Sequence, residues 1–159
     1  MMKFDQRKKG ESMFSNLLVP TDGSKLSDKA VAQALELAQA LKAKVTIFHA
    51  SPDYPTPVYA EGVSVEMVSR REYTKRAKED ATKVLDRVVA KAKSAGVEST
   101  VVHVIASSPW EAILAAAKKS KCDAIVMASH GRRGLAGLLL GSETTKVLTH
   151  SKIPVLVVR

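Results

Sequence analysis

Residues 123–142 read DAIVMASHGRRGLAGLLLGS, and this stretch decides the fold. Its apolar run from Ala124 to Met127 is typical of a buried strand, which we expect over residues 123–129. Four glycines then follow within eleven residues, at positions 131, 134, 137 and 141. A short helix is predicted from Ser142, whose hydroxyl is suited to cap it. A buried strand, a glycine-rich loop and a helix N-terminus in succession predict an anion site suited to phosphates.

The rest of the chain alternates between strand and helix periodicity. Apolar runs predict four further strands, over residues 14–20, 45–50, 101–106 and 155–158. Apolar residues at helical spacing predict three further helices: residues 24–41, a long one with its stripe over 77–92 ending at Gly96, and one from Ser108 and Pro109. The order β-α-β-α-β-α-β-α-β predicts an α/β fold, a single doubly wound five-stranded parallel sheet with helices on both faces.

A ligand site is expected where the winding of this sheet reverses. In doubly wound sheets a crevice opens there, beyond the carboxyl ends of the strands. With the first and fourth strands as neighbours, in the order 3-2-1-4-5, residues 20–24 and 128–142 meet at that point. The first segment contributes Pro20, Thr21 and Asp22, and Asp22 before Gly23 also suits a plain turn.

Length and cysteine content predict one cytoplasmic domain. The 159 residues are 45% hydrophobic, enough for a continuous core. Residues 1–12 are polar and basic, and we expect a flexible tail outside a domain over residues 13–159. The single Cys122 cannot form an internal disulfide, and no apolar stretch has the length of a signal peptide core or a membrane span.

The formal net charge of +9 raises the question of nucleic-acid binding. Basic residues between Arg70 and Lys93 are interleaved with acidic ones, which is typical of the solvated face of a long helix. Few aromatic residues lie near that segment to stack on bases. The pattern therefore argues against nucleic acid, although the charge would steer anionic nucleotides to the protein.

Four features together resemble the universal stress protein family. They are Asp22 after the first strand, Ser129-His130-Gly131, Gly141-Ser142, and the ending Ile153-Pro-Val-Leu-Val-Val158. The resemblance covers residues 13–159 and implies a Rossmann-like fold. The ATP-binding branch of that family carries Gly-x2-Gly-x9-Gly-Ser/Thr, and Ala128 stands here in place of the first glycine. Alanine keeps the backbone path if its φ is negative, but its methyl adds bulk beside a phosphate.

The resemblance implies a role for each residue of the expected site. It places Asp22 near the ribose or a metal, Val45 and Met127 near the adenine, and a third group around the phosphates: Ala128, Gly131, Gly141 and Ser142. The chemistry of the neighbouring side chains adds His130, and Arg132 or Arg133 as a charged fork on a terminal phosphate. Glu143 complements the helix dipole but would repel a phosphate if it turned inward.

These features predict a stress-response or signalling protein that binds ATP, or AMP or ADP, with Mg²⁺ accompanying the nucleotide. The resemblance also implies a homodimer joined through Val155, Leu156, Val157 and Val158. Residues 51–62, rich in proline, form a candidate lid. One alternative is a dimeric interaction module of the same fold that binds no nucleotide. Another is a slow ATPase, for which the sequence offers no convincing nucleophile or water-positioning base, and no Walker A motif occurs.

Overall fold

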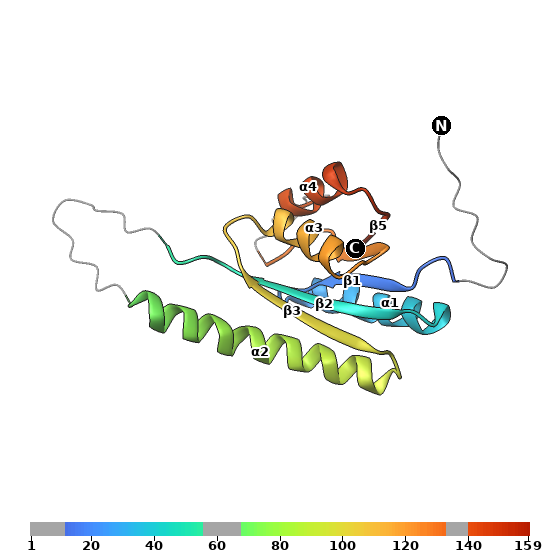
Figure 1. Ribbon diagram of the computed structural model, residues 1–159, viewed down its shortest axis with the longest axis horizontal. Helices are drawn as coiled ribbons and strands as arrows, with labels where there is room; N and C mark the ends of the chain where they lie inside the picture. Colours follow the sequence, from blue (N-terminus) through green and yellow to red (C-terminus); the bar gives the residue numbers. More distant parts are fainter. Residues whose placement is uncertain (1–11, 56–67, 133–139) are drawn as a thin grey trace.

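The computed structural model describes residues 12–55, 68–132 and 140–159. Five parallel strands form one sheet in the order β3-β2-β1-β4-β5, with helices on both of its faces (Figure 1). The elements follow one another as β1 Asn16–Pro20, α1 Lys25–Leu41, β2 Lys44–Ser51, α2 Arg70–Ser94, β3 Ser99–Ile105, α3 Pro109–Lys119, β4 Ala124–Ala128, α4 Ser142–His150 and β5 Val155–Val158. The predicted fold class and strand order are confirmed. Within the described residues, no helix is both long and apolar enough to cross a bilayer.

The winding reverses between β1 and β4, at the centre of the sheet. Leu17 of β1 pairs with Ala124 of β4, and Leu18 pairs with Ile125. From β1 the chain winds through β2 to β3 on one side, and from β4 it winds to β5 on the other. The carboxyl ends of β1 and β4 are therefore neighbours, as the sequence predicted.

Both faces of the central strands β1 and β4 and of most of β2 are buried, which explains why these strands are largely apolar. In β1 the side chains of Leu17 and Val19 join an apolar cluster with α1 and α2, whereas Leu18 joins a cluster with α3 and α4. In β2 Ile47 and Phe48 divide in the same way. Successive side chains point to opposite faces of a strand, so a sheet covered on both faces favours apolar residues at successive positions.

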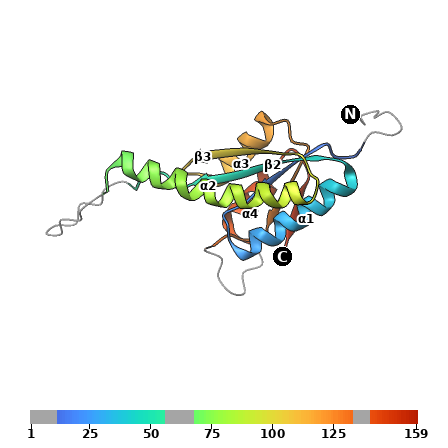
Figure 2. The same cartoon turned by 90° about the horizontal axis from the view of Figure 1, so that it is seen from below.

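The helix boundaries follow their capping residues. Ser24 caps α1 as predicted, because its side chain accepts a hydrogen bond from the Ser27 amide. The long helix α2 begins at Arg70 behind an N-cap at Ser69, one to two turns before the apolar stripe that predicted it. Its first turns extend past the ends of most of the sheet (Figures 1 and 2). The apolar stripe did not predict these first turns because they bury few side chains. The capping residue Ser69 is the local signal that marks where the helix begins.

Some predictions fall on residues outside the described part of the chain. These are most of the basic tail, most of the candidate lid, and residues 133–139 of the glycine-rich loop. Ser51, where the lid was expected to start, is instead the last residue of β2.

Candidate functional site

The segments after β1 and β4 meet through Asp22. Its Oδ1 accepts a hydrogen bond from the Ser24 amide at 2.9 Å, and its Oδ2 accepts one from the Arg132 amide at 2.7 Å. The first bond closes the turn into α1, and the second ties that turn to the start of the glycine-rich loop. We call this region, residues 20–24, 128–132 and 140–143, the carboxyl edge. A carboxylate thus lies at its centre.

The pKa of Asp22 is lowered from its ordinary value near 3.8 by opposing influences. Partial burial raises the pKa, but hydrogen bonds from Ser24, from the Arg132 amide and from Ser27 outweigh it. Asp22 is therefore ionised at neutral pH. An ionised carboxylate at this position can accept hydrogen bonds from ribose hydroxyls or contribute one oxygen ligand to a hard cation.

Position 131 requires glycine because its backbone lies too close to Asp22 for any side chain. A Cβ atom at position 131 would lie 2.7 Å from Asp22 Oδ2, closer than two such atoms can approach. The φ of Gly131 is not in the left-handed region, so the expected freedom of glycine at positive φ is not what this position uses. The glycine lets the loop backbone pass directly over the carboxylate.

The start of α4 is tied back to the end of β4. The Gly141 amide donates to the Ser129 carbonyl at 2.7 Å, and the Thr144 hydroxyl donates to the Ala128 carbonyl at 3.0 Å. A Cβ atom at position 141 would lie 3.1 Å from His130 Cβ and 3.2 Å from His130 Cα. Both ends of the glycine-rich loop are therefore held together at the carboxyl edge.

The prediction that Ser142 caps its helix is wrong. Gly141 is the N-cap residue of α4, and it offers no side chain to cap the helix. Ser142 is the first helical residue, one position past the N-cap, and its side chain makes no capping bond to the helix amides. Its exposed hydroxyl is left for other partners at this edge.

Glu143 turns away from the start of its own helix. Its Oε2 accepts a hydrogen bond from the Trp110 amide at 2.8 Å, and its Oε1 lies 3.3 Å from Lys146 Nζ. Ser108, the N-cap residue of α3, makes no side-chain capping bond, so Glu143 satisfies an amide there instead. The structure assigns Glu143 to joining α3 with α4, and its expected place beside a phosphate is not observed.

Three other predicted site residues lie elsewhere or are already engaged. The prediction for Val45 is wrong, because Val45 pairs with Leu17 at the amino end of β2 and is fully buried there. Thr21 is buried and its hydroxyl contacts Ser27, so it supports the turn. Met127 is buried against the α3–α4 cluster, one residue before the end of β4.

The register of the sheet brings together two histidines that the sequence assigned to no site. His49, at the carboxyl end of β2, hydrogen bonds through Nδ1 to the Thr21 carbonyl at 2.8 Å. Its ring stacks on His103 of β3, with centroids 5.9 Å apart, and His103 Nε2 lies 2.9 Å from Ser51 Oγ. Three parallel strands thus place polar groups at one edge. Only the strand pairing could have indicated them.

The side chains at the carboxyl edge could hold a cation only together with oxygen atoms from a bound molecule. The described residues include no group of three or more histidine, cysteine, aspartate or glutamate side chains that could hold a metal. The described residues of the carboxyl edge include two carboxylates, Asp22 and Glu143. Glu143 is held by Trp110 and Lys146, whereas each oxygen of Asp22 accepts one backbone hydrogen bond and can accept another partner. Mg²⁺ is commonly held by one or two carboxylates plus phosphate oxygens and water, and one carboxylate fits that pattern.

Comparisons with known proteins agree with this fold over nearly the whole chain. The model of the universal stress protein family matches residues 13–159. Universal stress protein MJ0531 of Methanocaldococcus jannaschii is 34% identical over 155 residues, which cover 94% of this chain and 85% of that protein.

Solved structures give the same result. The hypothetical protein MJ0577 superposes with a TM-score of 0.73 at 25% identity, over 92% of this chain and 96% of that one. A universal stress protein solved in complex with cAMP superposes with a TM-score of 0.63 at 29% identity, over 92% and 97%. With a family model that spans all the elements of the sheet, this chain belongs to the universal stress protein family.

Proposed function

We propose that this protein binds an adenine nucleotide at the carboxyl edge and acts in stress response or signalling. The observation that carries the proposal is the meeting of Asp22 with the backbone of Gly131 and Arg132 between β1 and β4. Gly141 and Ser142 lie at the same edge. There the first amides of α4 and the positive end of its helix dipole would attract an anion. The related structure that contains cAMP supports an adenine nucleotide as the ligand class.

ATP is the proposed ligand, and Ala128 is compatible with it. Ala128 ends β4 without a positive φ, so a side chain causes no backbone strain there. Its methyl packs against the cluster formed with α1 and α2, whereas α4 lies on the other face of the sheet. The methyl therefore does not lie across the start of α4. His130, Arg132 and Ser142 would contact the phosphates, with Pro20 and Met127 as apolar neighbours of the ligand.

Mg²⁺ would accompany the nucleotide, with Asp22 as the protein ligand or as the partner of the ribose. The lowered pKa keeps Asp22 ionised for either role. We infer slow hydrolysis at most, because the described residues of the carboxyl edge offer no candidate base to activate a water molecule other than Asp22 and His130. Both already accept or share hydrogen bonds, Asp22 with two amides and His130 Nδ1 with Ser129 Oγ at 3.2 Å.

A cytoplasmic homodimer completes the proposal. The free thiol of Cys122 is buried and fits a reducing compartment. β5 is an edge strand, and Leu156 on it is exposed, so a second copy pairing with β5 would cover that surface.

The test is nucleotide binding by matched glycine variants. Native mass spectrometry of the purified protein, then calorimetric titration with ATP, ADP, AMP and cAMP in Mg²⁺, should detect a bound adenine nucleotide. Gly141→Val should abolish binding because its side chain meets His130, while the circular dichroism spectrum stays unchanged. Gly96→Val, at a left-handed turn far from the carboxyl edge, controls for lost stability. If Gly141→Val binds as wild type does, the placement of the site is wrong. If wild type binds none of the four at millimolar concentration, nucleotide binding is wrong and an interaction module without nucleotide remains.

A further inference from the structure

β3 presents a free edge to solvent. Among the described residues only β2 pairs with it. The Val45 amide donates to the Glu98 carbonyl at 2.9 Å, and the Ala106 amide donates to the Ser51 carbonyl at 3.0 Å. Because alternate residues of a parallel strand bond to the same neighbour, the even-numbered residues of β3 face β2. The backbone groups of the odd-numbered residues, Val101 and His103 at their centre, therefore point outward.

This edge has none of the features that usually protect one. The seven residues of β3 read STVVHVI and include no lysine, arginine, aspartate, glutamate or proline. Val101 is 51% exposed. Natural proteins protect exposed edges with charged side chains, proline, bulges or very short strands. A seven-residue edge without them is suited to pairing with another strand.

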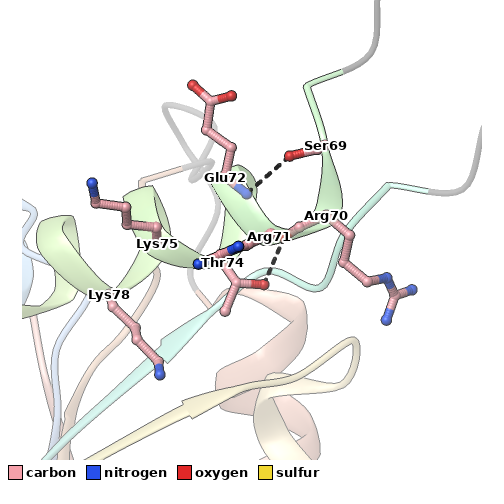
Figure 3. Close-up of a pocket in the computed structure, with 7 residues that line it drawn as sticks. All are labelled: Ser69, Arg70, Arg71, Glu72, Thr74, Lys75 and Lys78. Carbon is pink, nitrogen blue, oxygen red and sulfur yellow. Dashed lines mark hydrogen bonds between the residues drawn. The ribbon is translucent and has the colours of Figure 1, made fainter.

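A row of basic side chains runs along α2, on the side of the molecule that carries the free edge of β3. Arg71, Lys75 and Lys78 are spaced by four and three residues, so they share one flank of the helix. Figure 3 shows them at an open groove of about 800 Å³, where the side chain of Lys78 extends from the helix in the direction of the strands. The full lining is Ser69, Arg70, Arg71, Glu72, Thr74, Lys75 and Lys78.

Contacts place this basic row beside β3. His103 Nε2 lies 2.9 Å from Ser51 Oγ, which in turn lies 3.4 Å from the Ala77 carbonyl of α2. Lys78, the next residue, is close enough to His103 to lower its pKa, together with burial and His49. The positive row therefore starts level with His103 on the free edge.

The charge of the row is mostly unneutralised. Within the described chain, Arg71 and Lys78 make no ion pair, and Lys75 has only Glu79 at 4.0 Å on the exposed surface. Glu72, the one acidic residue in the groove, is paired with Arg76. Lys78 and Arg71 are seven residues apart, or about 10 Å along a helix, which equals about three residues of an extended strand.

We propose that the free edge of β3 and the basic row of α2 together bind an extended, acidic segment of a partner protein by strand addition. The backbone of the segment would pair with Val101 and His103, and acidic side chains beyond the end of β3 would meet the basic row. Outward amides and carbonyls match a peptide and not a nucleic acid. The nearby Tyr54 and Tyr73 pack edge to face on each other, and Arg70 lies over the Tyr54 ring, so they form no open platform for bases. This surface lies on another strand than β5 and does not depend on nucleotide binding.

The probe is a fluorescein-labelled peptide of alternating serine and valine, matched in length to β3, with about four glutamates at one end to span the basic row. Both orientations are tested, because an added strand can run parallel or antiparallel. Fluorescence anisotropy should show binding of one orientation. Replacing its glutamates by glutamine, or using the Lys75→Gln/Lys78→Gln double variant, should weaken binding by roughly tenfold at low salt.

The backbone part of the proposal has its own matched pair of variants. Val101→Pro removes an outward amide without removing a bond to β2, so it should abolish peptide binding. Val101→Thr keeps the amide and a β-branched side chain, and it should bind as wild type does. Circular dichroism and nucleotide titration check that each variant folds.

Three results would overturn the proposal. Equal peptide binding by Val101→Pro would mean that charge alone is recognised. Tighter binding of a single-stranded oligothymidine than of the peptide would assign the surface to nucleic acid. Self-association that Val101→Pro abolishes, seen by analytical ultracentrifugation, would assign the edge to a second copy of this chain.

Discussion

Asp22→Asn tests whether the carboxylate stabilises the carboxyl edge. The change keeps the shape of the side chain but removes the charge, and it presents an amide N–H to a backbone N–H. Asp22 accepts bonds from the Ser24 and Arg132 amides at 2.9 and 2.7 Å. A hydrogen bond to a charged group contributes about 1.5–3 kcal/mol. Because Asp22 is half-buried and solvent weakens such bonds, we expect the free energy of unfolding to fall by about 1–3 kcal/mol in all.

The pH dependence makes this prediction specific. The folded pKa of Asp22 lies below its unfolded value of 3.8, so the unfolded state binds the proton first. The stabilisation is therefore complete above pH 3.8 and is lost as the pH falls through the folded pKa. The gap between wild type and Asp22→Asn should be the same at pH 7 and pH 5 and should shrink at pH 3.

Urea unfolding followed by circular dichroism measures the difference in free energy of unfolding between the two proteins. In thermal unfolding, the Tm should fall by about 2–4 °C for each kcal/mol lost. The control is Asp28→Asn, which removes a partly exposed carboxylate paired with Arg87 and Lys91 on the surface. That variant should lose less than about 1 kcal/mol. Equal stability of Asp22→Asn and wild type at pH 7, or a gap that persists unchanged at pH 3, would refute the reasoning.

Three further predictions concern other parts of the molecule. Burial, His49 and Lys78 lower the pKa of His103 below 6.5, so stability should decline as the pH falls from 6.5 toward the folded pKa, and urea unfolding of His103→Gln between pH 7.5 and 5.5 should lack this contribution. Phe48 is 1% exposed, so Phe48→Ala should lower the free energy of unfolding by about 3–5 kcal/mol, and a loss below 1 kcal/mol in urea would contradict its place in the core. Leu156 is 47% exposed on β5, so Leu156→Lys should convert the proposed homodimer to monomer in analytical ultracentrifugation, and an unchanged mass would exclude β5 as the interface.

The sequence by itself determined the elements and their order along the chain. Runs such as Leu17-Leu18-Val19 are buried on both faces, and that requirement is visible in the residues themselves. Ser24 also caps α1 through an amide only three residues away. Local periodicity and local capping are properties of neighbouring residues, so they can be read without the fold.

Only the tertiary structure decided what meets at the carboxyl edge. Asp22 and Arg132 are 110 residues apart, and Glu143 reaches Trp110 across 33. From the sequence, Glu143 could either complement the dipole of its own helix or turn toward a phosphate, because only that helix could be considered. Val45 was misplaced for a related reason: a strand has two ends, and its pairing with Leu17 shows which end faces the site. Contacts between distant segments depend on register and packing, which no local pattern contains.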